Sequence, residues 1–537
     1  MIKKQAKQIF WNAMLLTAAS LLMRTVGVSF QVYVSNRAGA ETMGLFSLMS
    51  GVYGFALTLA TSGIHLGVTR VVTEAIGTGH HDCVRPAMRR ALLYSLVFGV
   101  GASVLLYSLA EQIGLLWLKD ARTVRSLRLF AISLPMISLS SSLSGYFTAV
   151  RRAYKNAVSQ VFEQGVKIML SMYLLAALLP KGIEATCCAL VLGGTFSEIA
   201  SFLFNGTLYL LDKDRKRRTQ GTSDGRLEGR KLLDIALPIA LTAYIRSGLL
   251  TLQHILIPEG LRSSGSSHAE ALVAYGSIQS MALPVILYPA ALIASFSGLL
   301  IPEMSASRVQ GHKKRISYMI SRVWFLSLLF SIGTAGILIC FSARIGEALY
   351  PNTNAGYYIR VLAPLIPIMY VDTATDAMMK GLGEQVYSMF INILDAALSV
   401  VLVVFLIPRY GIGGYLITIY VSEIFNTVLS VHHLLSITKT PVRLLKWVYK
   451  PLFCIVGATM SGKLLLPYVC RVFGNGLLST VLLCAVAVVL YLLLLRVTQS
   501  IDKEDILWFS TLFSRDQKKA SVGEKDWRDP PDTALYS

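Results

Sequence analysis

Long uninterrupted apolar segments are the feature of this sequence that most limits how it can fold. They recur along nearly the whole chain, and many approach or exceed the ~20 residues that a helix needs to cross a lipid bilayer. Only helices and closed barrels satisfy backbone hydrogen bonds in lipid, and barrel strands need only about 9–11 residues. We therefore predict an all-α polytopic membrane protein with about fourteen transmembrane helices. The expected spans are residues 9–35, 43–69, 91–118, 127–150, 156–179, 183–211, 232–258, 272–302, 319–343, 361–379, 386–408, 411–437, 447–469 and 475–495.

The amount and the placement of charge agree with this class. Charged residues make up 15% of the chain, whereas a typical soluble domain has about 25%, so a soluble enzyme and a disordered chain are excluded. The net charge of +20 could indicate nucleic acid. However, loops on the side of the N-terminus carry roughly three times as many Lys and Arg residues as the opposite loops. We therefore expect both termini in the cytoplasm and no nucleic-acid partner.

One loop departs from this charge pattern. It belongs to the opposite side of the membrane, yet it contains Lys119, Arg122, Arg125 and Arg128. Either an interfacial helix or a local error in the map of spans would explain these four residues.

The chain is organised as two similar halves. Residues 180–198 and residues 408–423 both read Pro, a basic residue, Gly-Ile, an apolar run and then Ser-Glu. Parallel repeats of this kind are a feature of transporters, which hold substrate between lobes near the membrane midplane. The expected parts are a six-helix lobe over 1–211, a flexible basic cytoplasmic linker over 212–231, a second six-helix lobe over 232–437, two extra helices over 438–496 and a cytoplasmic tail over 497–537.

No motif in the sequence supports catalysis, a metal site or a cofactor. The seven cysteines form no CxxC pair and most lie in apolar segments, so they are interpreted as small core residues. Nucleophile-elbow, HExxH and kinase motifs are absent from the sequence. We predict neither an enzyme nor a cofactor-binding protein.

The candidate functional residues are ionisable side chains inside the spans, because such groups are costly in lipid and need a partner, a wet cavity or a function. Arg24 lies about fifteen residues into the first span, roughly 22 Å along a helix axis, which is too deep for easy snorkelling. A guanidinium suits phosphate because it makes two parallel hydrogen bonds and stays charged. Arg24 is therefore predicted to contact an anionic head group, or alternatively to pair with Glu198. Arg246, at the corresponding place in the seventh span, could face the same cavity.

The fifth span carries a polar stripe. Gln160, Glu163, Gln164 and Lys167 are spaced so that all four lie on one helical face, either lining a cavity or joining helices. Five acidic residues in other spans are candidates for coupling transport to protons or sodium, although structural pairing is the alternative for each. They are Glu198, Asp372, Asp376, Asp395 and Glu423.

Several segments resemble a known family. They are RTVG at 24–27, GYFTAVRRAYKNAVSQVFEQGVKI at 145–168, YGSIQSMALPVILYP at 275–289 and LIPEMSAS at 300–307. Together with the repeat, they resemble the polysaccharide-flippase branch of the multidrug/oligosaccharidyl-lipid/polysaccharide exporter superfamily. The resemblance implies fourteen helices in two lobes around a central cationic cavity. It also implies flipping of undecaprenyl-pyrophosphate-linked saccharides or peptidoglycan precursors across the bacterial cytoplasmic membrane, in cell-wall or spore-cortex synthesis. Membrane lipids and envelope-synthesis proteins are the expected partners.

The sequence departs from related lipid II flippases at two places. A second arginine that some of them carry a turn after the first is replaced by Phe30, and their arginine in span eight falls in an apolar stretch around Pro284. Two other functions fit the same scaffold. One is a cation-coupled multidrug exporter, and the other is a membrane scaffold for envelope assembly that transports nothing.

Overall fold

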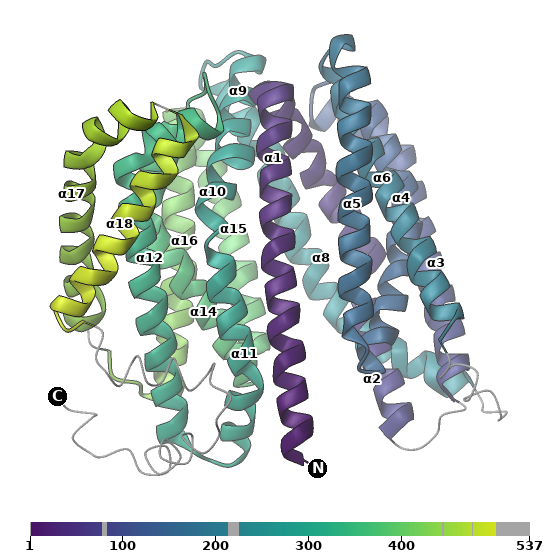
Figure 1. The fold of residues 1–537 in the computed structure, drawn as a ribbon. Helices are drawn as coiled ribbons and strands as arrows, with labels where there is room; N and C mark the ends of the chain where they lie inside the picture. The colour runs from purple at the N-terminus through teal and green to yellow at the C-terminus, as the bar shows by residue number, and fades with distance from the viewer. Residues whose placement is uncertain (1, 78–82, 213–224, 443–444, 475, 501–537) are drawn as a thin grey trace. The chain divides into compact units, whose positions relative to one another are not determined.

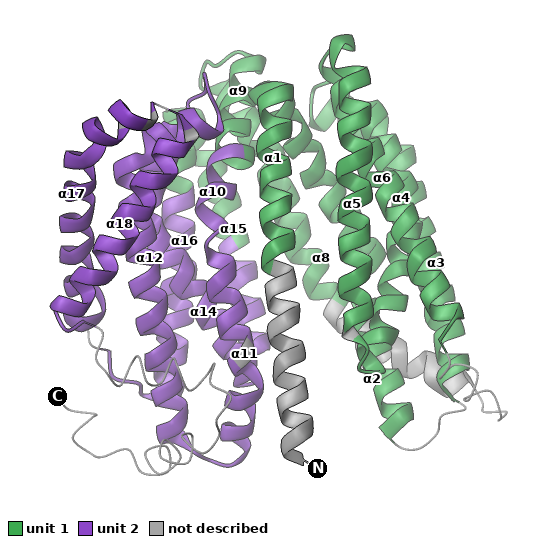
Figure 2. Ribbon diagram, viewed as in Figure 1, with its two compact units in different colours: residues 1–280, 396–418 green, residues 281–395, 419–537 purple. Residues whose placement is uncertain are grey.

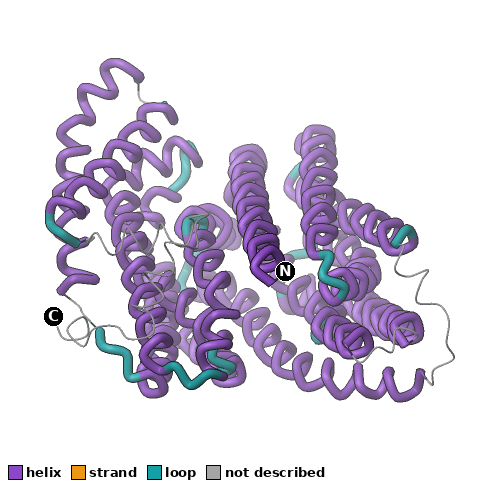
Figure 3. The backbone as a smooth tube through the Cα atoms, turned by 60° about the horizontal axis from the view of Figure 1, so that its bottom comes forward, coloured by secondary structure: helices purple, strands orange, loops and turns teal. Residues whose placement is uncertain are grey.

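The computed structural model describes residues 2–77, 83–212, 225–442, 445–474 and 476–500. Within these residues the secondary structure is helical throughout, with short connecting loops and no strand (Figures 1 and 3). Twelve of the described helices are long and apolar enough to cross a membrane. The predicted all-α polytopic fold is confirmed. The predicted number of transmembrane helices, fourteen, is approximate.

The chain divides into two compact units (Figure 2). Unit 1 comprises residues 1–280 and 396–418, and unit 2 comprises residues 281–395 and 419–537. The lobe boundaries drawn from the repeat stay a prediction. Residues 213–224 of the predicted linker and 501–537 of the predicted tail lie outside the described residues, and from Gly225 onward the end of the linker is helical.

Unit 1 is built mainly from the first half of the chain. Its helices are α1 (Ile2–Thr61), α2 (Ile64–Gly77), α3 (Val84–Gln112), η2 (Ile113–Trp117), α4 (Arg122–Ala149), α5 (Ala153–Leu178), η3 (Leu179–Lys181), α6 (Ile183–Leu210), α8 (Gly225–Ser263), α9 (His268–Gly276) and the start of η4 (Ser277–Ala282). Unit 2 continues from the end of η4. Its helices are α10 (Leu283–Leu287), α11 (Ala290–Val309), α12 (Lys313–Leu349), α13 (Ala355–Leu362), η5 (Ala363–Leu365), α14 (Ile366–Gly381), η6 (Leu445–Tyr449), α17 (Lys450–Phe473) and α18 (Leu477–Val497). The helices α15 (Gln385–Tyr410) and α16 (Ile412–Thr438) are divided between the units.

Local backbone features explain where the helices differ from the predicted spans. The first two predicted spans join into one long helical element that is interrupted at Gly39, whose φ of 81° is outside the helical region. The predicted span 272–302 is broken into α9, η4, α10 and α11, with a π-helix over Ser277–Ala282 and Pro289 before α11. The repeat has matching starts, since Gly182 (φ 97°) precedes α6 and Gly411 (φ 55°) precedes α16.

Small residues let the helices of each unit approach closely, as is usual in membrane bundles. In unit 1 a Cβ on Gly99 of α3 would lie 2.9 Å from the Cα of Pro135 in α4. The Ser138 hydroxyl beside it lies 2.7 and 2.8 Å from the Ala60 and Ser95 carbonyl oxygens, which share its one hydrogen. In unit 2 the centre is α12, where a Cβ on Gly333 would lie 2.7 Å from the Tyr491 ring.

One glycine crossing in unit 1 positions the functional site. A Cβ on Gly276 of α9 would overlap the Ala40 carbonyl oxygen and lie 2.6 Å from the backbone nitrogen of Gly44 in α1. A Cβ on Gly44 would in turn lie 2.8 Å from the carbonyl carbon of Leu272. The two backbones are therefore in direct contact, and η4, which follows α9 immediately, is held beside α1.

The basic loop that departs from the charge pattern is largely neutralised by ion pairs. Arg122 bonds the Asp120 carboxylate at 2.7 Å and Glu41 at 3.0 Å, and His268 Nε2 lies 2.9 Å from Asp120. Burial raises the pKa of Asp120, but hydrogen bonds from Arg122 and His268 outweigh burial and hold that pKa below its usual range. Further pairs join Lys119 to Glu259 and Arg128 to Glu111. Lys119 and Asp120 lie in the turn between η2 and α4, and Arg122, Arg125 and Arg128 lie in the first turns of α4.

Candidate functional site

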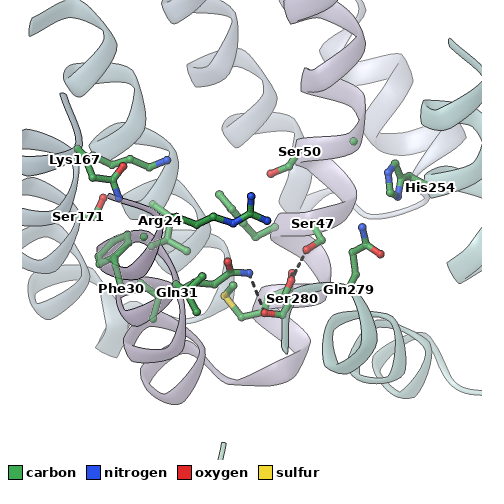
Figure 4. Close-up of a pocket in the computed structure, with 18 residues that line it drawn as sticks. Arg24, Phe30, Gln31, Ser47, Ser50, Lys167, Ser171, His254, Gln279 and Ser280 are labelled. Atoms are coloured by element: carbon green, nitrogen blue, oxygen red, sulfur yellow. Dashed lines mark hydrogen bonds between the residues drawn. The ribbon is translucent and has the colours of Figure 1, made fainter. Parts of the chain in front are cut away.

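Unit 1 contains a cavity of about 590 Å³ (Figure 4). This volume lies within the range of ~300–1,000 Å³ that is usual for small-molecule sites. The cavity is formed by α1, α5, α6, α8 and η4. Its lining residues are Arg24, Gly27, Val28, Phe30, Gln31, Val34, Met43, Phe46, Ser47, Ser50, Gly51, Gln164, Lys167, Ser171, Leu190, His254, Gln279 and Ser280.

The helical period explains which residues of α1 reach the cavity. Before the interruption at Gly39, lining residues recur at Arg24, Gly27, Gln31 and Val34, spacings that place them on one face. After Gly39 a second face is lined by residues 43, 46, 47, 50 and 51. Both halves of α1 therefore contribute one face to the same cavity.

Two cationic side chains, Arg24 of α1 and Lys167 of α5, face the cavity (Figure 4). Both are exposed rather than packed into the bundle. Gln164 lies one turn before Lys167 on the same lining face. Guanidinium and ammonium groups together form a setting for anionic ligands, and phosphate in particular accepts several hydrogen bonds from such groups.

A neutral polar group lies beside the cations. Gln31 Nε2 donates to the Ser280 carbonyl oxygen at 2.9 Å. The Ser280 hydroxyl is hydrogen-bonded to the Ser47 hydroxyl and lies 3.2 Å from the Met43 carbonyl. Ser280 belongs to the π-helix η4, in which the altered backbone pairing exposes polar groups that a regular helix would use internally.

On another side of the cavity, two polar residues are held by buried tyrosines. His254 Nδ1 is hydrogen-bonded to the Tyr275 hydroxyl at 2.7 Å, and the Tyr415 hydroxyl donates to Gln279 Oε1 at 3.2 Å. Tyr275 and Tyr415 are 0% and 2% exposed, and their ring centroids are 6.4 Å apart. These contacts fix the orientation of both lining side chains.

The polar stripe of the fifth predicted span is divided by the structure. Gln164 and Lys167 line the cavity, whereas Gln160 is exposed elsewhere on α5. Glu163 accepts a hydrogen bond from the Ser201 hydroxyl at 2.9 Å and interacts electrostatically with Lys167 and Glu198. Lys167 therefore links the cavity to a pair of carboxylates between α5 and α6.

The remaining predicted residues lie apart from this cavity. Arg246 is exposed on α8 and is not among the lining residues. In unit 2, Asp372 accepts from Asn426 at 3.2 Å, Asp395 accepts from Ser422 at 2.5 Å, and Glu423 interacts electrostatically with both carboxylates. Asp376 instead pairs with Lys380 at 2.6 Å near the end of α14. Asp372, Asp395 and Glu423 thus form an acidic group in unit 2, which does not include Asp376.

Sequence reasoning missed the neutral lining residues. Gln31, His254 and Gln279 lie inside apolar segments, where a search for charged groups passes over them. The sequence does carry a signal for His254, because a histidine within a predicted span is a polar group that needs a partner. Gln279 offers no comparable signal, since its place depends on the contact between Gly276 and Gly44.

No group of three or more His, Cys, Asp or Glu side chains among the residues that the structure describes is placed to hold a metal ion.

Comparison with known proteins agrees with this architecture. A family described as "Polysaccharide biosynthesis protein" matches residues 9–258. Stage V sporulation protein B of Bacillus subtilis (strain 168) is 25% identical over 430 residues, covering 79% of this chain and 83% of that protein. The lipid II flippase MurJ of the same organism is 23% identical over 446 residues, covering 76% of this chain and 79% of that protein.

Solved structures show the same fold. A structure of the lipid II flippase MurJ in an inward closed conformation has a TM-score of 0.70 at 12% identity and covers 90% of this chain and 98% of that one. An inward-facing multidrug resistance transporter of the MATE family has a TM-score of 0.63 at 14% identity and covers 80% and 99%.

These matches show that the chain resembles multi-pass membrane transporters and flippases of the multidrug/oligosaccharidyl-lipid/polysaccharide exporter superfamily. Within that superfamily it resembles the polysaccharide-flippase branch, and stage V sporulation protein B in particular. The resemblance seen in the sequence motifs is confirmed. The named activities of these relatives are transport and flipping rather than catalysis.

Proposed function

We propose that this protein flips an undecaprenyl-pyrophosphate-linked saccharide across the bacterial cytoplasmic membrane, with both of its termini in the cytoplasm. The saccharide would be a peptidoglycan precursor or another envelope building block, used in cell-wall or spore-cortex synthesis. The observation that carries this proposal is the cavity in unit 1, which combines Arg24 and Lys167 with neutral hydrogen-bonding groups.

The chemistry of such a substrate matches the cavity. A pyrophosphate carries the negative charge that Arg24 and Lys167 would neutralise, and Arg24 would supply paired hydrogen bonds. The saccharide would find hydroxyl and amide partners in Ser47, Ser50 and Gln31. The polyprenyl tail is apolar and far larger than the cavity, so it would remain in lipid while the head group moves.

The proposed mechanism is alternating access, in which the head group is released on the opposite side of the membrane without any covalent step. The drive would be an ion gradient, the membrane potential or removal of the product. The acidic group Asp372, Asp395 and Glu423 is our candidate for ion coupling in unit 2. Glu163 and Glu198, which interact with Lys167, are a second candidate.

A cation-coupled multidrug exporter is the second candidate function, and it is favoured by the acidic group in unit 2. Such an exporter would bind apolar or cationic drugs in preference to anions. The two cations in the unit 1 cavity favour an anionic substrate instead. A scaffold that transports nothing would need no cavity around Arg24, so the cavity also supports transport.

The test is a flipping assay in vesicles that contain the purified protein and a labelled undecaprenyl-pyrophosphate saccharide. Loss of a hydrogen bond to a charged group costs about 1.5–3 kcal/mol, so Arg24→Ala should slow flipping about tenfold to a hundredfold. Arg24→Lys should restore part of the rate because it keeps the charge. Arg246→Ala is the matched control, and its rate should stay near that of the wild type. If Arg24→Ala flipped the lipid at the wild-type rate, the proposed role of Arg24 would be wrong.

A further inference from the structure

The wall formed by His254 and Gln279 has a property that the charged residues lack. Both side chains line the cavity, and each is fixed from behind by the hydroxyl of a buried tyrosine. In Figure 4 they lie on the right, whereas Arg24 and Lys167 come from the centre and the left. The cavity is therefore polarised, with cations toward one side and uncharged polar groups toward the other.

The hydrogen bond to Tyr275 determines which nitrogen of His254 carries the proton. The Tyr275 side chain is completely buried, so leaving its hydroxyl hydrogen without an acceptor would be costly. Nδ1 of His254, at 2.7 Å, is the acceptor that the described structure offers. Since a neutral imidazole has one donor and one acceptor, the hydrogen then resides on Nε2.

The same reasoning applies to Gln279. The buried Tyr415 hydroxyl donates to Oε1, which assigns the two ends of the amide and leaves the –NH₂ group for the cavity. Figure 4 shows this nitrogen directed toward the space beside Ser47 and His254. The wall thus presents uncharged N–H donors from two residues, both oriented before any ligand arrives.

We infer that His254 and Gln279 form a specificity site for the saccharide, whose hydroxyl and N-acyl carbonyl oxygens accept hydrogen bonds from Nε2–H and –NH₂. This inference rests on the proposed function, because it assigns the sugar part of the same substrate to one wall. Uncharged, preoriented donors suit neutral acceptor oxygens, while the pyrophosphate is held by the cations. A site built to hydrogen-bond a substrate discriminates strongly against an analogue that lacks the acceptor.

The experiment measures binding of two probes to the purified protein in lipid nanodiscs. One probe is undecaprenyl pyrophosphate, and the other is the same lipid bearing one N-acetylglucosamine. His254→Ala should weaken binding of the glycosylated lipid about tenfold and leave binding of the sugarless lipid unchanged. Arg24→Ala should weaken binding of both probes. His312→Ala, which changes an exposed histidine before α12, is the matched control and should affect neither.

Two further variants separate contact from positioning. Tyr275→Phe keeps the ring but removes the hydroxyl that orients the His254 imidazole. It should therefore weaken binding of the glycosylated lipid about threefold. His254→Gln supplies an N–H donor of similar reach and should recover part of the loss. These variants also serve if His254→Ala does not fold, which thermal unfolding of the purified proteins would reveal.

The possible results distinguish failure of the specificity site from failure of the proposed flippase function. If the wild type binds both lipids but His254→Ala and His254→Gln weaken both equally or neither, the specificity site is overturned and the flippase proposal stands. If the wild type binds neither lipid, the proposed function falls and the inference falls with it. Selective loss of the glycosylated lipid would support both.

Discussion

The Ser-Glu pairs at residues 197–198 and 422–423 occupy corresponding places in the two halves of the repeat, yet their surroundings differ. Each follows a helix start after a glycine with positive φ, Gly182 in one case and Gly411 in the other. Glu198 interacts with Glu163 and with a cation, Lys167. Glu423 interacts with two further carboxylates, Asp372 and Asp395.

Even the supporting hydrogen bonds are similar in the two places. A serine of α6, Ser201, donates to Glu163 of the preceding helix, and a serine of α16, Ser422, donates to Asp395 of the preceding helix. The helix pairs have therefore kept a polar contact while the charge around it changed. From this contrast in charge we propose different roles for the two units: unit 1 binds the anionic head group, and unit 2 responds to cations.

The largest effect is expected at the close helix crossings, and among the described residues each unit has one such crossing between two glycines. Gly276→Ala would place a Cβ 2.6 Å from Gly44 N in unit 1, and Gly346→Ala would place one 2.6 Å from Gly356 N in unit 2. Both should lower the thermal stability of the purified protein by several degrees, because a backbone contact cannot yield as a flexible side chain can. Only Gly276→Ala should also reduce binding of undecaprenyl pyrophosphate, because it displaces η4 from the cavity.

Gly54→Ala is the control for this pair, since a Cβ there meets nothing within 4 Å. It should leave stability unchanged or raise it by up to about 1 kcal/mol through better helix propensity. Equal loss of lipid binding in Gly276→Ala and Gly346→Ala would contradict the assignment of the cavity to unit 1 alone.

An intermediate effect is expected from neutralising the acidic group of unit 2. Glu423→Gln removes one of three neighbouring carboxylates and should abolish most of the acceleration that a proton or sodium gradient gives to flipping in vesicles. Equilibrium binding of undecaprenyl pyrophosphate should stay unchanged, because we propose that unit 1 binds that lipid. Asp376→Asn, which alters the separate pair with Lys380, should keep the gradient response. A normal gradient response in Glu423→Gln would exclude this residue from coupling.

The smallest effect concerns pH and the ion-paired loop of unit 1. The pKa of Asp120 is lowered in the folded protein, so its stabilising contribution is present above the unfolded value of about 3.9 and is lost as pH falls through the folded pKa. Asp120→Asn should therefore lower the melting temperature at pH 7 by about 2 °C. It should also flatten the decline of the melting temperature below pH ~4 relative to the wild type.

Asp376→Asn is again the comparison, because exposed ion pairs contribute little, about 0–1 kcal/mol. The Asp120 side chain is 5% exposed, whereas the Asp376 side chain is 33% exposed. If both variants changed the melting temperature equally, the buried position of Asp120 would not be the cause of its effect.

Much of the fold could be predicted from the sequence because lipid imposes a simple rule on apolar segments. Length and hydropathy located most helices, and the glycine before each Ser-Glu repeat marked real helix starts at Ile183 and Ile412. The breaks within 272–302 were not predicted, since a π-helix depends on local backbone pairing that hydropathy does not report.

Only the charged residues of the candidate site can be predicted directly from the sequence. Arg24 and Lys167 stand out because an ionisable group in a span is costly, and Gln164 follows from helical spacing to Lys167. The sequence does not single out Tyr275 or Tyr415, because each looks like an ordinary apolar residue of a transmembrane span. Their role depends on contacts between helices, because Tyr275 of α9 reaches His254 of α8, and Tyr415 of α16 reaches Gln279 of η4 from 136 residues away.

The central claim is that the cavity of unit 1 holds the anionic head group, and photocrosslinking tests it most directly. A benzophenone-bearing amino acid would replace Phe46 in the cavity, or Ile419 one turn before Glu423 in unit 2. After illumination with a radiolabelled undecaprenyl-pyrophosphate saccharide, we expect labelled protein from position 46, loss of that label with Arg24→Ala, and no label from position 419. Labelling at position 419 with none at position 46, in proteins that still flip lipid, would contradict it.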